Sequence, residues 1–466
     1  MKINKDSSQT IFNILSQLIL NGINFVLIML FTRYLTTDHY GIVSIYQAYV
    51  SFFAVLVGLN TQGSIGTAFV HLKIEEHNNY LASILSLSLS SFLIILGISC
   101  AFMHSFSEFS QLEPGLLILM LFHSLGSFCF QFVNIKYVYS RKAQYSCMLA
   151  SGIALLMIGI SWLSIRYSSS TMPQYMGRIL GLSLPYIFCA IFVIISVFLK
   201  GNPFIGIKKY WLFCIPICLP LVFHGFSQVV LAQTDKIMLQ KLLGDNGTVG
   251  VYSFFVTFVH ILNSLYTALN NTWVPIYYGY TKENKFEEIE LRSKSYHNCF
   301  TIMVIGFMLV SPEIVKLFAD KNYWNGMKLI PMVAFSIYMV FLYSFAVNYE
   351  LYHRESKWIA VGTTAAAICN IIFNRLLIPL LGMYGAAIAT LGAYILLYVF
   401  HDICARCVIK GKYPYKKDFF IKNVLIVILF CIFYYLFIGQ WAIRWITAAI
   451  VGSYLVYMCY KNKSIF

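Results

Sequence analysis

Charged side chains are rare in the apolar stretches of this sequence, and basic ones recur at similar positions near one end of them. They are Arg33, Arg166, Arg178, Lys236 and Arg375, and one acid, Asp235, directly precedes Lys236. An ionisable group inside a bilayer costs about 2.5–3.5 kcal/mol on insertion scales unless it faces protein or water. Arginine and lysine hold anions by charge-assisted hydrogen bonds, and arginine can form two parallel bonds. The chemistry that this set favours is therefore binding of an anion.

Two interpretations remain open for these residues. Each basic side chain either extends to the membrane interface or joins a cationic cluster at the mouth of a cleft, where Asp235 orients Lys236 or takes part in ion coupling. Uncharged polar residues lie deeper in the apolar stretches. They are Asn24, His224, Gln228, His260, Asn263 and Asn370. Such side chains form hydrogen bonds between helices or contact a polar substrate.

One short motif resembles a metal site in part. Cys404 and Cys407 are separated by two residues, and His401 lies nearby. A zinc site needs further ligands, which the neighbouring sequence lacks. We expect no metal and no cofactor, and we interpret most of the 12 cysteines as small buried hydrophobic residues.

The composition is that of a membrane protein. Hydrophobic residues make up 59% of the 466 residues and charged residues only 11%, which leaves too little polar surface for a water-soluble globule. Apolar windows of about 20 residues recur along the chain, as transmembrane helices require. The uncharged run from Ser7 to Thr32 exceeds the core of a typical signal peptide, so we expect a retained span there.

We predict an all-α integral membrane protein with about 14 transmembrane helices. Their ranges are about 9–32, 41–69, 80–103, 115–135, 144–165, 179–199, 210–238, 249–278, 295–312, 329–349, 358–377, 383–403, 423–440 and 441–460. The connections are short, which leaves no room for a soluble catalytic domain. We therefore expect no enzyme activity.

The chain repeats itself after about 209 residues. Placing Gly41 on Gly250 also aligns Ser44 with Ser253. The predicted domains are residues 1–200, an N-terminal six-helix bundle; residues 201–408, a C-terminal six-helix bundle that repeats the first; and residues 409–466, two additional helices. Because each repeat has an even number of spans, we expect two parallel bundles that face a central cleft.

The net charge of +15 follows from topology. With the N-terminus inside, roughly two thirds of the 33 lysine and arginine residues fall on the inner side of the spans. The positive-inside rule then places both termini in the cytoplasm. No nucleic-acid partner is needed to explain the basic composition.

Three segments carry a resemblance to a known family. They are TRYLTTDHYGIVS near the N-terminus, DKIMLQKLLGDNGTVGVYS at the centre and NRLLIPLLGMYGAAIATLGAY in the second half. In order and spacing they resemble the Wzx-type polysaccharide flippases, of O-antigen or capsule type, within the multidrug, oligosaccharidyl-lipid and polysaccharide exporter superfamily. The resemblance covers residues from about 7 to 405, and a twelve-span core is its common pattern, so the last two spans depart from it.

The resemblance implies a flippase of the bacterial inner membrane. Its substrate would be a polyprenyl-pyrophosphate-linked oligosaccharide, moved by alternating access and possible coupling to protons or sodium. Arg33, Arg375, Lys236, Arg178 and Arg166 would bind the pyrophosphate, and the uncharged polar residues would contact sugars. Other partners would be membrane lipids and further membrane proteins of glycan assembly.

Two alternatives stay open. An ion-coupled drug or small-molecule antiporter of the same superfamily shares the fold. The first spans of this sequence, however, lack a membrane-embedded carboxylate of the kind that a resemblance to such antiporters would imply. A membrane glycan polymerase or glycosyltransferase is also basic and has many spans. Such an enzyme needs a large outer loop or an acidic cluster at the membrane surface, and the sequence offers neither.

The topology is directly testable. Reporter fusions after Lys142, Lys209, Lys294 and Lys417 should all report a cytoplasmic location, because basic connections stay inside. A fusion after Pro114 should report an external location. The opposite pattern would overturn both the number of spans and the cytoplasmic N-terminus.

Overall fold

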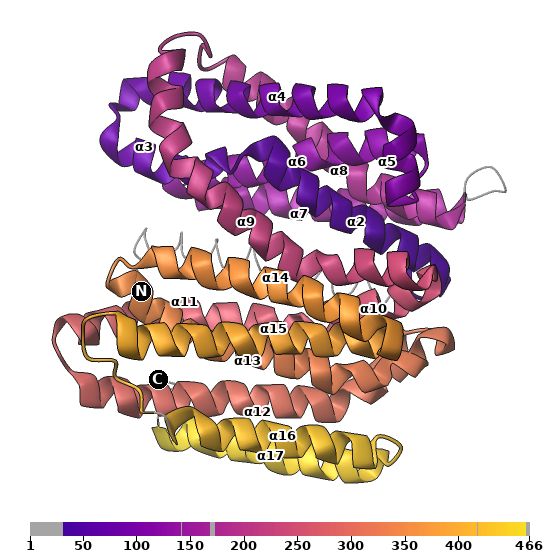
Figure 1. Cartoon of the computed structure of the whole chain (residues 1–466), viewed down its shortest axis with the longest axis vertical. Coiled ribbons are helices and arrows are strands. Elements are labelled where there is room, and N and C mark those ends of the chain that lie inside the picture. Colours follow the sequence, from indigo (N-terminus) through magenta and orange to yellow (C-terminus); the bar gives the residue numbers. More distant parts are fainter. Residues whose placement is uncertain (1–30, 141, 168–172, 417, 463–466) are drawn as a thin grey trace. The chain divides into compact units, whose positions relative to one another are not determined.

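The computed structural model describes residues 31–140, 142–167, 173–416 and 418–462, in which all regular structure is helical (Figure 1). The longer helices are α2 (Thr37–Gly58), α3 (Ile65–His71), α4 (His77–Ala101), α5 (Met103–Ser110), α6 (Pro114–Tyr139), α7 (Ala143–Arg166), α8 (Gln174–Phe198), α9 (Ile207–Leu243), α10 (Asn246–Val259), α11 (Ile261–Lys282), α12 (Phe286–Phe318), α13 (Ile330–Tyr352), α14 (Ser356–Leu381), α15 (Met383–Ile403), α16 (Asp418–Phe437) and α17 (Trp441–Asn462). Short helical segments are η1 (Thr61–Ser64), η2 (Ile74–Glu76), η3 (Lys321–Leu329) and η4 (Cys404–Val408). The predicted all-α class is confirmed.

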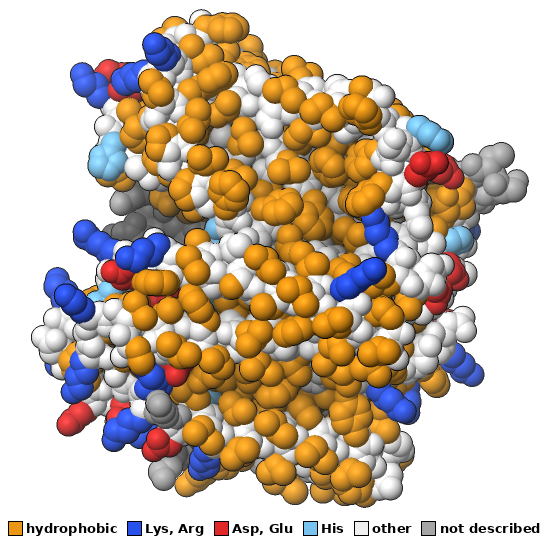
Figure 2. Space-filling model, in the orientation of Figure 1, with side chains coloured by type: hydrophobic (Ala, Val, Ile, Leu, Met, Phe, Trp, Pro, Cys, Tyr) orange, Lys and Arg blue, Asp and Glu red, His pale blue; other side chains and the backbone are white. Residues whose placement is uncertain are grey.

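The helical surfaces match a lipid environment. Among the described residues, 12 helical spans are long and apolar enough to cross a membrane. On the face that Figure 2 shows, hydrophobic side chains cover the middle, whereas the visible lysine and arginine side chains lie mainly toward the left and right sides. Large apolar side chains such as Leu93, Phe192 and Leu429 are exposed, which is unfavourable in water and favourable in lipid.

The chain forms two compact units. The first contains the described residues between 39 and 237, and the second those up to 38 together with those from 238 onward. Within the first unit, α8 packs against α6 and α7. Within the second, α15 packs against α13 and α14, and α12 packs against α16 and α17 (Figure 1). The predicted domain ranges and the internal repeat stay predictions.

Two connections between consecutive helices turn at a glycine. Gly244 has a φ of +68° and ends α9, and the carboxylate of Asp245 then accepts hydrogen bonds from the amides of Gly247 (2.8 Å) and Thr248 (3.2 Å). These bonds satisfy two free N–H groups at the start of α10. Gly382, with a φ of +58°, similarly separates α14 from α15. Left-handed backbone of this kind favours glycine, because it has no Cβ.

The structure divides two helices that the sequence predicts as continuous. The predicted span 41–69 breaks after α2, where Leu59 and Asn60 have φ values of 47° and 50°. Asn60 tolerates this conformation, and its amide donates to the carbonyl of Leu221 on α9 (2.5 Å). The predicted span 249–278 bends at His260, between α10 and α11. Hydropathy does not reveal such breaks, because apolar residues continue through them.

The last two predicted spans correspond to two helices, α16 and α17. Of these, α16 is among the 12 spans of sufficient length and hydropathy in the described ranges, and α17 is not. The first predicted span, 9–32, lies outside the described residues except for its last two. The count of 14 therefore stays a prediction.

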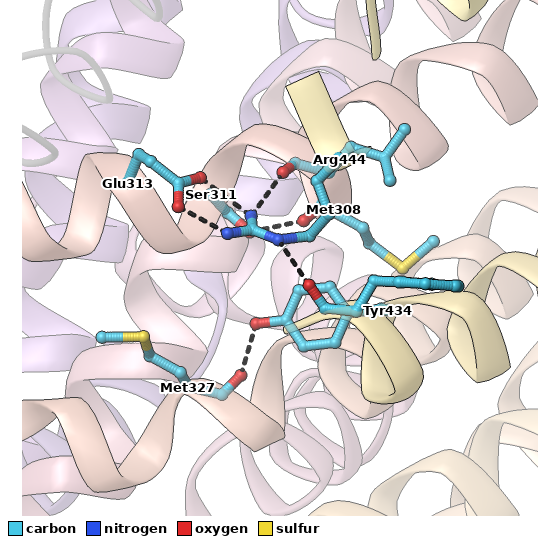
Figure 3. A network of polar contacts seen from close by, with 8 residues as sticks. Met308, Ser311, Glu313, Met327, Tyr434 and Arg444 are labelled. Atoms are coloured by element: carbon cyan, nitrogen blue, oxygen red, sulfur yellow. Dashed lines mark hydrogen bonds and ion pairs between the residues drawn. The ribbon is translucent and has the colours of Figure 1, made fainter. Parts of the chain in front are cut away.

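A buried arginine fixes α17 against α12 (Figure 3). The side chain of Arg444 is fully buried, and its two terminal nitrogens lie 2.8 and 2.5 Å from the two carboxylate oxygens of Glu313. The same guanidinium donates to the carbonyls of Leu309 (2.8 Å) and Phe437 (3.1 Å). Beside it, the hydroxyl of Tyr434 donates to the carbonyl of Met327 (2.9 Å). These contacts explain how an arginine is tolerated in an apolar helix.

Replacing Arg444 by leucine should lower the free energy of unfolding by about 3 kcal/mol, because Glu313 and two backbone carbonyls lose their partner. Arg444→Lys keeps the charge but cannot form the paired bonds, so it should fall between the leucine variant and the wild type. Unfolding of the purified protein in detergent measures both effects. Equal stability of all three proteins would show that this network does not hold α17.

Candidate functional site

The second unit carries two of the predicted anion-binding residues, Arg33 and Arg375. Arg33 is exposed, and its guanidinium donates to the carbonyls of Leu317 (2.6 Å) and Phe318 (3.1 Å), the last two residues of α12. A cation at a helix C-terminus is favourable, because carbonyl groups without intrahelical partners point there. Arg375 is exposed on α14, and its side chain forms no hydrogen bond or ion pair with the described residues.

The first unit carries the other three basic residues. Arg178 on α8 is buried, and its guanidinium donates to the hydroxyl of Ser161 on α7 (2.8 Å). Arg166 is exposed at the end of α7 and lies over the ring of Trp162, 5.8 Å from its centroid. Arg178 therefore already has an internal role in packing α7 against α8, whereas Arg166 lies at the surface of the unit.

Lys236 and Asp235 differ in their surroundings although they are adjacent on α9. Lys236 is half-buried, and its ammonium group donates to the amide oxygen of Gln233 (2.9 Å). Asp235 is buried and interacts electrostatically with Lys236. The predicted role of Asp235, to orient or partly neutralise this lysine, stays a prediction.

The uncharged polar residues fall into different environments. His224, Gln228 and Asn263 are half-buried, His260 is exposed, and Asn24 lies outside the described residues. Asn370 is fully buried: its amide donates to the hydroxyl of Thr390 on α15 (3.3 Å) and its oxygen accepts from Asn374 (3.0 Å). The two interpretations for such residues are a hydrogen bond between helices and contact with a polar substrate. For Asn370 the structure favours the hydrogen bond.

The two cysteines of the Cys404–Cys407 motif differ in their exposure. Cys404 is buried and Cys407 is exposed, and they lie on the π-helical turn η4. Within the described ranges, no group of three or more His, Cys, Asp or Glu side chains is arranged to hold a metal ion. The neighbouring His401 has a different partner.

That partner is Glu350, which no motif in the sequence indicates. The two side chains are fully buried, and Nδ1 of His401 lies 2.8 Å from Oε1 of Glu350. Glu350 is in the last turn of α13, and His401 is in the last turn of α15. The predicted span 329–349 ends one residue before Glu350, so the acid was assigned to a connection. The helical continuation to Tyr352 could have been suspected from the apolar residues that precede it.

The sequence comparisons then decide the family. Residues 8–278 match the family described as Polysaccharide biosynthesis protein. The chain belongs to this family. An uncharacterized membrane protein of Haemophilus influenzae is 22% identical to it over 426 residues, which cover 87% of this chain and 98% of that protein.

Solved structures share the fold of this member of the polysaccharide biosynthesis family. The lipid II flippase MurJ in its inward closed conformation superposes with a TM-score of 0.70 at 16% identity, over 97% of this chain and 99% of that one. An inward-facing multidrug transporter of the MATE family, within the MOP superfamily, gives 0.57 at 15% identity, over 85% and 94%. The eukaryotic MATE transporter AtDTX14 gives a TM-score of 0.54 at 13% identity, over 91% of this chain and 98% of that one.

The chain is a member of the polysaccharide biosynthesis family and has the fold of the MurJ and MATE structures. The predicted resemblance to the exporter superfamily is confirmed. The particular substrate, the coupling ion and the residues that bind them are matters for proposal.

The contrast between Arg178 and Arg166 is testable by stability. Arg178→Gln should lower the free energy of unfolding by about 1–3 kcal/mol, because the buried hydroxyl of Ser161 loses a charged partner. Arg166→Gln is the matched control and should change stability by less than about 0.5 kcal/mol, since the side chain is exposed. Thermal unfolding in detergent compares the two. A destabilisation of the same size in both variants would contradict the internal role of Arg178.

Proposed function

We propose that this protein is a flippase that moves a polyprenyl-pyrophosphate-linked oligosaccharide across the bacterial inner membrane by alternating access. The observation that carries the proposal is the family match combined with the fold: a member of the polysaccharide biosynthesis family has, over 97% of its length, the fold of a protein named as a lipid II flippase. In this proposal both termini lie in the cytoplasm. The glycan is of O-antigen or capsule type.

Such a substrate imposes a physical requirement on the protein. Its lipid tail is soluble in the bilayer, whereas its pyrophosphate and sugars are not, so the protein must supply hydrogen bonds to the polar part during the crossing. The pyrophosphate needs cations whose N–H groups are not all engaged within the protein. Its sugars need neutral donors and acceptors.

Arg33 meets the requirement for the pyrophosphate. Its two bonds to the end of α12 hold the guanidinium in place, and the group has further N–H donors that these bonds do not use. A positioned guanidinium loses less side-chain entropy when it binds than a freely moving one. We therefore assign Arg33 to the pyrophosphate, although its loss would also remove the cap of α12.

Arg375 is the second assigned ligand and the cleaner one to test. Its side chain is exposed and forms no bond to the described residues, so all of its donors are available. Exposed neighbours on α14 are apolar, among them Ile371 and Leu376. Where apolar surroundings exclude water, the bonds between a cation and phosphate oxygens are stronger.

The remaining predicted contacts take secondary roles in the proposal. Lys236, Arg166 and Arg178 supply further positive potential, with Arg178 limited by its bond to Ser161. His224, Gln228, His260, Asn263 and Asn24 are the proposed sugar contacts. Asn370 is omitted from them, since its amide is engaged by Thr390 and Asn374.

An ion-coupled antiporter of drugs is the alternative. The MATE structures share the fold, but with TM-scores of 0.57 and 0.54 against 0.70 for the flippase structure. A purified protein that moves a fluorescent drug and not a lipid-linked glycan would decide for the antiporter.

Replacing Arg375 by glutamine should abolish translocation of a fluorescent polyprenyl-pyrophosphate-linked oligosaccharide in proteoliposomes, because the phosphate oxygens lose a charged partner. Arg375→Lys should retain part of the activity, since it keeps the charge but not the two-bond geometry. Arg33→Gln should behave in the same way if the protein remains folded.

The matched control is Lys357→Gln on the same helix. Lys357 is exposed, lies near the start of α14 and pairs with Glu355 (2.9 Å), so its loss should leave translocation unchanged. Unfolding curves for each variant separate loss of function from loss of fold. Normal translocation by the folded Arg375→Gln variant would disprove the assignment of the pyrophosphate ligands.

A further inference from the structure

The Glu350–His401 pair in the second unit is an ionisable pair within helices that cross the membrane. Both side chains have no exposed surface, and the contact joins α13 to α15 at 2.8 Å. The second atom of each group, Oε2 of Glu350 and Nε2 of His401, has no hydrogen-bond partner among the described residues. Buried polar atoms are nearly always hydrogen-bonded, so two such atoms in one pair require a reason.

We propose that Glu350 and His401 form a proton-binding site, and that the proton bound there is the coupling ion of transport. Only the coupling of this proton to transport rests on the proposed function. The site itself follows from the geometry of the second unit.

The pair can exchange a single proton by simple chemistry. Without the extra proton, Nδ1–H of His401 donates to the Glu350 carboxylate, Nε2 is a free lone pair, and the pair carries one negative charge. A proton that arrives at Nε2 or at Oε2 makes the pair neutral, and no other group has to change. The two atoms without partners are therefore where the proton enters and leaves.

The pair lies where a net charge is unfavourable. A net charge is costly in a dry interior. Glu350 and His401 also lie in the last turns of their helices, where the partial negative charge of the carbonyl groups disfavours an anion. Entry of water into the site would reduce both effects and release the proton. A conformational change that opens the site is thereby linked to proton release.

Three residues lie around the pair, and none of them has to take part in the proton exchange between Glu350 and His401. On α13, the ring of Tyr343 stacks on His401 at 5.7 Å. On α14, Gly362 lies so close that a Cβ there would be 2.7 Å from Nε2 of His401. Beyond His401, the thiol of Cys404 interacts electrostatically with Glu350.

Two charged groups near the pair bind each other. Arg406 binds Asp402 (2.7 Å) and the carbonyl of Tyr415 (2.6 Å), so the charges of Asp402 and Arg406 offset each other. Directly after α13, Nδ1 of His353 lies 2.9 Å from the carbonyl of Tyr349. In the following loop, burial raises the pKa of Tyr413 well above its ordinary value, so this phenol stays neutral at physiological pH. Among the described contacts of the Glu350 carboxylate, the one ion pair is with His401.

The first experiment does not depend on transport. The full-length protein, labelled with ¹⁵N at histidine and placed in lipid nanodiscs, is titrated by NMR from about pH 5 to 9, the range in which histidine commonly changes charge. The His401 signal is identified by its loss in His401→Asn. We expect it to change between two protonation forms, with a midpoint that shifts in Glu350→Gln. A His401 signal that stays constant over the range in the wild type would overturn the site.

A matched control comes from the same chain. His104 and Glu108 also form a His–Glu contact, at 3.3 Å, but 89% and 70% of their side-chain surface is exposed. Glu108→Gln should leave the His401 midpoint unchanged. A shift of equal size in that variant would show that the effect of Glu350→Gln is not local.

The second experiment tests coupling in proteoliposomes that contain a pH-sensitive dye and the lipid-linked oligosaccharide. Translocation by the wild type should move protons, and Glu350→Gln should lose proton movement, while Glu350→Asp should retain part of it. Proton movement equal to that of the wild type in Glu350→Gln, or translocation by the wild type without proton movement, would overturn the coupling role. If the wild type translocates no glycan at all, the proposed function fails, and the NMR titration still decides whether the proton site exists.

Discussion

The interior of a bilayer offers no water, so every polar group that enters it must be satisfied by the protein itself. Helices satisfy the backbone, and the side chains then have to find partners one at a time. Arg444 with Glu313 and Arg178 with Ser161 show the two common solutions, an ion pair and a hydrogen bond between neighbouring helices. Each of these contacts also selects which helices pack together, because a buried arginine without its partner would be too costly. The polar contacts thus determine helix packing that apolar side chains alone would leave less specific.

The same constraint separates structural cations from those that remain able to bind a ligand. Arg178 and Arg444 are buried and engaged, whereas Arg375 is exposed and has its donors available, and Arg33 combines a fixed position with unused donors. Because the chain belongs to the polysaccharide biosynthesis family, a lipid-linked glycan is the ligand that we propose for the available guanidinium of Arg375. Basic residues at similar predicted depths in the membrane therefore do not form a uniform set. The depth of a residue does not determine which partner its side chain has.

The proposed proton site and the proposed phosphate ligand Arg33 lie toward opposite ends of the second unit. Arg33 binds the end of α12, which is followed by the start of α13, while Glu350 is in the last turn of α13. A helix rises about 1.5 Å per residue, so the length of α13 separates the two by roughly 30 Å. At that distance direct electrostatic coupling is weak. Coupling would instead act through the packing of α13, α14 and α15, which a change at Glu350 and His401 alters at one end.

The sequence by itself determined the membrane environment, the all-helical class and the family resemblance. These features depend on composition and on short local segments, which neighbouring residues encode directly. Tertiary structure alone decided which polar residues meet. Glu350 and His401 are separated by 51 positions, and Arg444 and Glu313 by 131, so no local pattern pairs them. It also decided that α2 ends at Gly58 and that Asn60 turns toward α9, because that break is stabilised by a carbonyl 161 residues away. Local chemistry fixes which segments enter the membrane, and packing fixes which of their polar side chains remain free to act.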